Sequence, residues 1–172
     1  MREIIRFAWG ISSLGEFMVT RSDKGLVALE FSSRRSATEQ ALPVRFPEAD
    51  VVAGQEDLID ILEKVRRAIE EPGLDPGVPL DLRGTPYEVE VWSMLRAIPM
   101  GETTNYGALA AKLGTRDDRE VTEAIACNPI AVLVPCHRVI KKDGSISGYR
   151  WGLKRKRELL AREQRSGAFQ LV

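Results

Sequence analysis

A segment rich in proline and glycine, residues 71–79, divides this sequence into two parts with different patterns. Three prolines and two glycines lie within its nine residues, too many for a helix or a central strand. Strand-like segments dominate before it, and helix-like segments dominate after it. We therefore place a boundary near Gly84 and predict two domains, residues 1–83 and residues 84–172, in an α/β (α+β) fold.

The first part has the pattern of a small mixed or antiparallel sheet with helices. Five short segments rich in β-branched, aromatic or aliphatic residues fit strands. They are residues 4–8, 15–20, 26–31, 51–52 and 80–82. A short helix is expected at residues 36–46. A longer amphipathic helix is expected at about residues 58–69, where apolar residues recur every three or four positions. No group of reactive side chains occurs here, so we expect this domain to be a scaffold.

The second part opens with a strong helix signal and is expected to be mainly helical. Thr85, Pro86 and Glu88 have the spacing of a capping box with proline at the first helical position. This predicts a helix that runs to Pro99, where the chain must leave it.

Two further short helices fit a helix-turn-helix outline. The first is capped by Thr103 or Thr104 and ends at Gly114. The second runs from about Asp117 to Cys127, which is expected to be a small buried or half-buried residue. As a bare pattern this outline is weak, because most such helix pairs bind nothing.

The last third of the sequence fits a hairpin and a helix. Val139 and Ile140 are predicted to pair with Ile146 across a turn. A final helix is expected at residues 153–163, with three leucines inward and a basic run largely outward. The leucines are Leu153, Leu159 and Leu160, and the basic residues are Lys154, Arg155, Lys156 and Arg157.

The segment with the clearest chemistry joins a cysteine to the only histidine of the chain. An apolar run, residues 130–134, stops at Pro135 and is followed by Cys136 and His137. A cysteine attacks as the thiolate, and a nearby imidazole is one way to lower its pKa. The alternative is a buried structural cysteine beside an incidental histidine. Adjacent residues in an extended segment point to opposite sides, so a bend or a bridging water is needed for contact.

Composition limits the remaining classes. Residues 1–83 carry 11 Lys and Arg against 15 Asp and Glu, and residues 84–172 carry 14 against 10. A basic second half suits a polyanionic partner, although the bias is modest. Two cysteines and one histidine are too few for a disulfide framework or a zinc site. With no signal-peptide layout and no apolar run long enough for a membrane, we expect a cytoplasmic protein in a reducing compartment.

The signature Pro135-Cys136-His137-Arg138-Val139-Ile140 resembles the active-site motif of the O6-alkylguanine-DNA alkyltransferases, of the Ogt and Ada carboxy-terminal type. Further matching residues follow the order and near spacing of that family. They are Tyr87, Val91, Trp92, Leu95, Ile98, Pro99, Gly101, Thr103, Tyr106, Leu109, Ala110, Asp143, Gly144, Gly148, Tyr149, Gly152, Lys156, Leu159, Leu160 and Glu163.

The resemblance implies a DNA-repair protein that works once. Such a protein moves the alkyl group irreversibly from O6 of guanine, and from O4 of thymine, to its own cysteine. The partner implied is double-stranded DNA, bound at the minor groove with the damaged nucleotide flipped out. The resemblance also implies an RNase H-like first domain, a monomer, no cofactor and no metal.

Five residues match catalytic positions of the family. Cys136 matches the alkyl acceptor, His137 the base that takes the thiol proton through a water, and Glu163 the residue that orients the histidine. Asn128 matches the asparagine that braces the turn around the site. Tyr149 matches the tyrosine that supports guanine as the leaving group.

Five other residues are assigned to DNA by the same resemblance. Tyr106 matches the tyrosine that presses on the adjoining phosphate, and Arg119 the arginine that fills the vacated place in the stack. Backbone carbonyls near Cys136 and Val139 are expected to read the guanine amino group. Thr104 and Arg138 complete the predicted DNA contacts. Arg116 competes with Arg119, since counting from Gly114 rather than from Asn128 shifts the alignment.

The sequence departs from the family on its recognition helix. Acidic residues stand at Asp117, Asp118, Glu120 and Glu123, where they either point away from DNA or weaken its binding. Three alternatives follow: a lesion-binding relative, which usually lacks the cysteine; part of an Ada-type alkylation sensor; and a thiol hydrolase. The zinc cysteines of such sensors do not occur in this sequence. A thiol hydrolase would catalyse many turnovers. An alkyltransferase would stop after one, because the thioether that it forms does not hydrolyse.

Overall fold

The computed structural model describes residues 2–73, 76–115, 117–146 and 148–170, with side chains to residue 165 in the last helix. The chain forms two compact units: Met1–Glu70 with Leu74–Leu82, and Glu71–Gly73 with Arg83–Val172. The fold is mixed α/β, as predicted from the sequence.

The first unit is built on a four-stranded sheet of order β3-β2-β1-β4. β1 (Glu3–Ser12), β2 (Gly15–Arg21) and β3 (Leu26–Phe31) are antiparallel, and β4 (Ala49–Ala53) pairs in parallel with β1. β1 is longer than predicted, because its pairing with β2 continues until Ser12 faces Gly15. Among the described residues of the predicted strand at 80–82, only Leu80 bridges the sheet, at Leu26.

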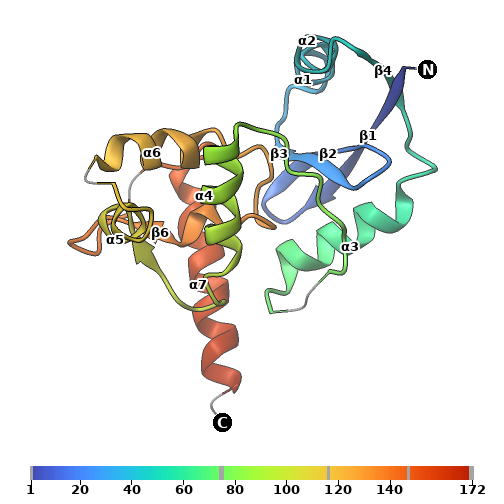
Figure 1. The fold of residues 1–172 in the computed structure, drawn as a ribbon. Helices are drawn as coiled ribbons and strands as arrows, with labels where there is room; N and C mark the ends of the chain where they lie inside the picture. The colour runs from blue at the N-terminus through green and yellow to red at the C-terminus, as the bar shows by residue number, and fades with distance from the viewer. Residues whose placement is uncertain (1, 74–75, 116, 147, 171–172) are drawn as a thin grey trace. The chain divides into compact units, whose positions relative to one another are not determined.

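Helices pack against this sheet (Figure 1). The predicted helix at residues 36–46 is two helices, α1 (Arg35–Gln40) and α2 (Leu42–Arg45), because Pro43 lacks an N–H and starts a new turn. The predicted amphipathic helix is α3 (Ile59–Glu70), which packs against β1.

The second unit gathers three short helices (Figure 1). α4 (Pro86–Arg96) begins with the predicted capping box of Thr85 and Glu88. α5 (Tyr106–Lys112) and α6 (Asp118–Ala126) pack against each other after a turn at Gly114, where φ is 74°. The indole of Trp92 donates to the carbonyl of Ala124 at 2.8 Å, which ties α4 to α6.

The N-cap of α5 is Asn105, so the predicted cap at Thr103 or Thr104 is wrong. The Asn105 side chain accepts from the N–H of Ala108 at 2.8 Å. Thr104 instead belongs to the short strand β5 (Thr104–Asn105), which pairs in parallel with β6 (Val139–Ile140).

The predicted hairpin is therefore wrong for the described residues. Val139 pairs with Thr104 rather than with the segment that contains Ile146. A turn does follow β6, because the N–H of Gly144 donates to Lys141 and the N–H of Lys141 donates to Ser145. The local turn signal was sound, but the partner strand lies 35 residues earlier in the chain.

The last helix, α7 (Leu153–Gln170), is longer than predicted, and the residues on its buried face differ from the predicted ones. Lys156, Leu159 and Glu163 are buried, whereas Leu153 is 39% exposed. The inward face thus carries two charged residues, and each has polar partners. None of the helices within the described ranges combines the length and the hydrophobicity that crossing a membrane requires.

Candidate active site

Cys136 begins a 3-10 turn, η1 (Cys136–Arg138), rather than lying in an extended segment. The turn is held by a hydrogen bond from the N–H of Arg138 to the carbonyl of Pro135, at 3.0 Å. Cys136 is only 4% exposed and His137 is fully buried. The bend that the sequence required for neighbouring residues to cooperate is therefore present.

Asn128 holds the loop that leads to the cysteine. Its side-chain amide donates to the carbonyl of Val134 at 2.9 Å, and its side-chain oxygen accepts from the N–H of Ile130 at 3.0 Å. Within this loop Val132 has a φ of 66°, a left-handed conformation that is costly for a β-branched residue. The side chain of Asn128, itself fully buried, keeps the strained loop closed.

His137 and Glu163 form a buried pair. The Nε2 atom of His137 lies 2.7 Å from Oε1 of Glu163. Burial lowers the pKa of His137, so the ring is neutral at pH 7, despite the opposing effect of Glu163. A neutral ring that meets a carboxylate through Nε2 carries its proton there, which leaves Nδ1 as an acceptor. Nδ1 is buried and has no hydrogen-bond partner in the described part of the chain.

Arg138 keeps Glu163 ionised. Its guanidinium donates to both carboxylate oxygens of Glu163, at 2.9 to 3.2 Å, and to the carbonyl of Ile98 at 2.6 Å. Burial opposes the charge of Glu163, but the bonds from His137 and Arg138 hold its pKa at about 2. These contacts favour a positioning role for Arg138 over the DNA contact that the sequence predicted.

The thiol of Cys136 is protonated at rest. Burial raises its pKa to about 11, against the opposing effects of the Asn128 side chain and of the positive charges of Lys156 and Arg150. The idea that a neighbouring histidine lowers this pKa does not hold for the resting site. A base must therefore take the proton when the sulfur attacks.

Two tyrosines lie close enough to Cys136 for its thiolate form to raise the pKa of their hydroxyl groups. Burial raises the pKa of Tyr149 well above its ordinary value, and Cys136 raises it further. The Tyr149 hydroxyl is buried without a hydrogen-bond partner among the residues that the structure describes. Burial and Cys136 also raise the pKa of half-buried Tyr106, at the first position of α5.

Lys156 lies in the site, although the run of basic residues around it predicted an exposed position. Its side chain is fully buried, and Nζ donates to the carbonyls of Val139 at 2.7 Å and Gly148 at 3.2 Å. Burial lowers its pKa, while Cys136 raises it. The only sequence signal was its place among the family-matched positions, seven residues before Glu163. The carbonyl of Val139, predicted to read guanine, already accepts one bond.

Arg119 lies on the surface in the first turn of α6. Its side chain is 86% exposed, and Nε is 3.3 Å from Oδ1 of Asp117, the N-cap residue of the helix. Its competitor Arg116 lies outside the described residues. Glu120 and Glu123 line a separate pocket with residues of α4, so these two acids lie on the side of α6 that faces α4.

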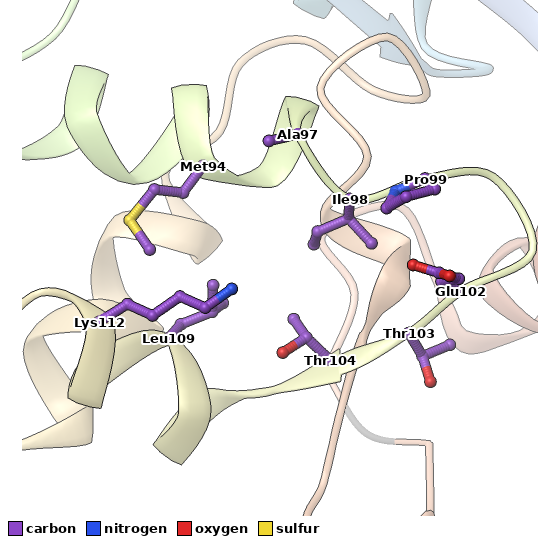
Figure 2. A pocket seen from close by; sticks show the side chains of 9 residues that line it. All are labelled: Met94, Ala97, Ile98, Pro99, Glu102, Thr103, Thr104, Leu109 and Lys112. Carbon is purple, nitrogen blue, oxygen red and sulfur yellow. The ribbon is translucent and has the colours of Figure 1, made fainter.

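A second pocket, of about 280 Å³, lies between the end of α4 and α5 (Figure 2). Met94 from α4 faces Lys112 from α5 across it, and Thr104 is the predicted site residue on its wall. The lining residues do not include Cys136, so this pocket is not the cavity of the thiol. Among the described residues no cluster of three His, Cys, Asp or Glu side chains suits a metal ion.

Comparison with known proteins identifies the family. The profile described as "6-O-methylguanine DNA methyltransferase, DNA binding domain" matches residues 86–165. The methylated-DNA--protein-cysteine methyltransferase of Candida albicans is 37% identical over 142 residues, which cover 81% of this chain and 76% of that protein. The chain belongs to the O6-methylguanine-DNA methyltransferase family.

Solved structures of this family have the same fold. The structure of Mycobacterium tuberculosis OGT in complex with DNA superposes with a TM-score of 0.77 at 32% identity, covering 94% of each chain. The bifunctional transcriptional activator/DNA repair enzyme Ada of Escherichia coli K12 is 36% identical over 160 residues, 92% of this chain and 45% of that protein. The chain thus spans about half the length of Ada.

Proposed function

We propose that this protein repairs DNA by moving an alkyl group from O6 of guanine, and from O4 of thymine, to Cys136 in one irreversible step. The observation that carries the proposal is the buried pair of His137 and Glu163 directly after Cys136, with Nδ1 of the histidine available as an acceptor. This is the arrangement of a nucleophile, a base and a residue that orients the base.

The sulfur attacks as its proton is removed. Arg138 holds Glu163 as a carboxylate, and Glu163 accepts from Nε2–H of His137. Nδ1 of His137 then takes the proton of the Cys136 thiol through a bridging water. Because the pKa of the thiol is about 11, this removal has to accompany the attack, and the nearby cations Lys156 and Arg150 stabilise the sulfur as it becomes negative.

The alkyl group moves in the same step. A bond forms between Sγ of Cys136 and the alkyl carbon while the bond from that carbon to O6 breaks, and guanine leaves. Tyr149 donates its hydroxyl proton to the departing base, because an anionic purine leaves poorly. Burial keeps that hydroxyl protonated. A thioether does not release its carbon to water, so each chain reacts once.

The partner in this proposal is double-stranded DNA, approached from the minor groove by α5 and α6. The alkylated nucleotide leaves the stack to reach a buried thiol. Exposed Arg119 occupies the space left behind, and Tyr106 contacts the neighbouring phosphate. The acids near Arg119 reduce the general affinity for phosphates. The protein acts as a monomer in a reducing compartment, which keeps its thiol available.

The test is the mass of the intact protein after incubation with excess duplex that contains one O6-methylguanine. We expect a gain of about 14 Da, the mass of one methylene unit added to a thiol. The gain should map to Cys136 and saturate at one per chain, and Cys136→Ala should bind without reacting. Binding without a mass gain would favour a lesion-binding protein or part of an alkylation sensor. Continuing turnover would favour a thiol hydrolase.

A further inference from the structure

The loop that carries Tyr149 is connected to the loop that delivers Cys136 by one arginine side chain. Nη1 of Arg150 donates to the backbone carbonyl of Asn128 at 3.0 Å. Asn128 is the residue whose side chain closes the turn before the cysteine. A single hydrogen bond thus joins segments 22 residues apart in sequence.

The same guanidinium reaches Tyr149 through an aromatic contact. It stands over the ring of Trp151, 5.4 Å from the centroid, where a cation is attracted to the face of the ring. The ring of Trp151 meets the ring of Tyr149 edge to face, with centroids 5.4 Å apart. Trp151 itself is buried, so it transmits the position of the arginine to the tyrosine.

Nothing at the tip of Tyr149 fixes its position. The hydroxyl lacks a hydrogen-bond partner in the described residues, so the ring is oriented by its neighbours alone. A proton donor has to lie within hydrogen-bond reach of the atom that it serves. A contact that holds the ring therefore bears directly on the rate of the chemical step.

We propose that Arg150 is a positioning residue, which latches the Tyr149 loop to the carbonyl of Asn128 and so places the tyrosine against Cys136. The inference rests on the proposed alkyl transfer. The charge of Arg150 also favours the thiolate of Cys136, but Arg150 is an exposed residue, so solvent weakens that effect. The latch is the larger part of its role.

The experiment compares Arg150→Ala, Arg150→Lys and Arg150→Met with Arg157→Ala. Lys and Met have similar lengths, but only Lys keeps a positive charge and an N–H donor. Arg157 is exposed on α7, so its loss removes one charge away from the latch. The rate of methyl transfer is measured in a single turnover at saturating oligonucleotide, single-stranded and duplex, with binding measured separately.

We expect Arg150→Ala and Arg150→Met to slow transfer about tenfold, less than the roughly hundredfold contribution of a proton donor. Arg150→Lys should recover most of the rate, and Arg157→Ala should leave it unchanged. In a Tyr149→Phe background the loss caused by Arg150→Ala should shrink to less than threefold, because the latch then positions nothing. Thermal unfolding of each variant checks that the chain is folded.

Three results would overturn the latch. One is equal rates for Arg150→Ala and Arg157→Ala. A second is an undiminished loss in the Tyr149→Phe background, and a third is a loss confined to DNA affinity, which would make Arg150 a phosphate contact. Wild-type protein that accepts no methyl group would refute the proposed function itself. The wild-type reaction therefore separates the two failures.

Discussion

The imidazole of His137 and the carboxylate of Glu163 meet at 2.7 Å inside the protein, with less than a tenth of either residue exposed. Their contact links the turn after the nucleophile to the last helix. It gives the histidine one protonated nitrogen and one acceptor nitrogen.

Glu163→Gln should slow methyl transfer by at least about tenfold, since a neutral amide no longer favours the proton on Nε2 or stabilises the imidazolium. Glu158→Gln is the matched control, because Glu158 lies on the same helix and pairs only with arginines on its own helix among the described contacts. Single-turnover rates by mass spectrometry check this. Equal rates for the two variants would remove Glu163 from the mechanism.

Stability should fall as the pH falls below neutrality. The folded pKa values of both His137 and Glu163 lie below their ordinary ones, so the unfolded chain binds more protons in acid. The contribution of His137 declines below about pH 6.5, and that of Glu163, at most about 3 kcal/mol, declines between roughly pH 4.5 and pH 2. Urea unfolding from pH 8 to pH 3 measures the change. A constant free energy of unfolding between pH 7 and pH 4 would contradict it.

Iodoacetamide should label Cys127 well before Cys136 at pH 7. Cys127 is exposed after α6, contrary to the buried or half-buried position expected from the sequence, whereas Cys136 is buried with a pKa of about 11. The thiolate is the form that reacts. Peptide mapping after short exposures measures both rates, and unfolding in urea should make them similar. Faster labelling of Cys136 in the folded protein would show that its thiol is already activated.

Lys156→Met should destabilise the protein by about 1–3 kcal/mol, because two carbonyls lose a buried donor. The carbonyls belong to Val139 and Gly148. Lys154→Met, two residues earlier on the exposed side of α7, should change stability by less than about 0.5 kcal/mol. Chemical unfolding compares the pair. If the Lys156→Met protein is as stable as wild type, the free energy lost by burying the ammonium group equals the free energy gained from its hydrogen bonds.

Arg119→Ala should slow repair of duplex more than repair of a single strand, because only the duplex has a stack to hold open. We expect about a tenfold difference between the two substrates, or about 1.4 kcal/mol, which is part of the few kcal/mol that unstacking costs. Arg157→Ala again controls for charge. An equal effect on both substrates would assign the role to Arg116 or remove it.

The features that the sequence predicted best are set by neighbouring residues. The capping box of Thr85 and Glu88 and the start of α6 near Asp117 each depend on atoms within three positions, so the local pattern was enough. Cys136 and His137 are consecutive residues, so their proximity follows directly from the sequence. Glu163 came from the family spacing, since a helical glutamate read alone is expected at the surface.

The features that it missed depend on distant partners. Lys156 lies in a run of four basic residues, which normally indicates a solvated face, and only the carbonyls of two other segments make its burial favourable. Val139 was assigned to a hairpin because a good turn follows it, but the 3-10 turn before it aligns it with Thr104. Arg150 gave no signal, because its partner is a backbone atom 22 residues away.

The burial of Cys136 has a further consequence for a chain that has already reacted. Cys136 is only 4% exposed, so a methyl group on its sulfur adds volume to a nearly closed interior. Extra volume in a packed interior typically costs about 1–3 kcal/mol. The methylated protein would then unfold at a lower temperature than the unreacted protein. Its lower stability would expose it to proteolysis, so a molecule that has reacted would differ in stability from one that has not.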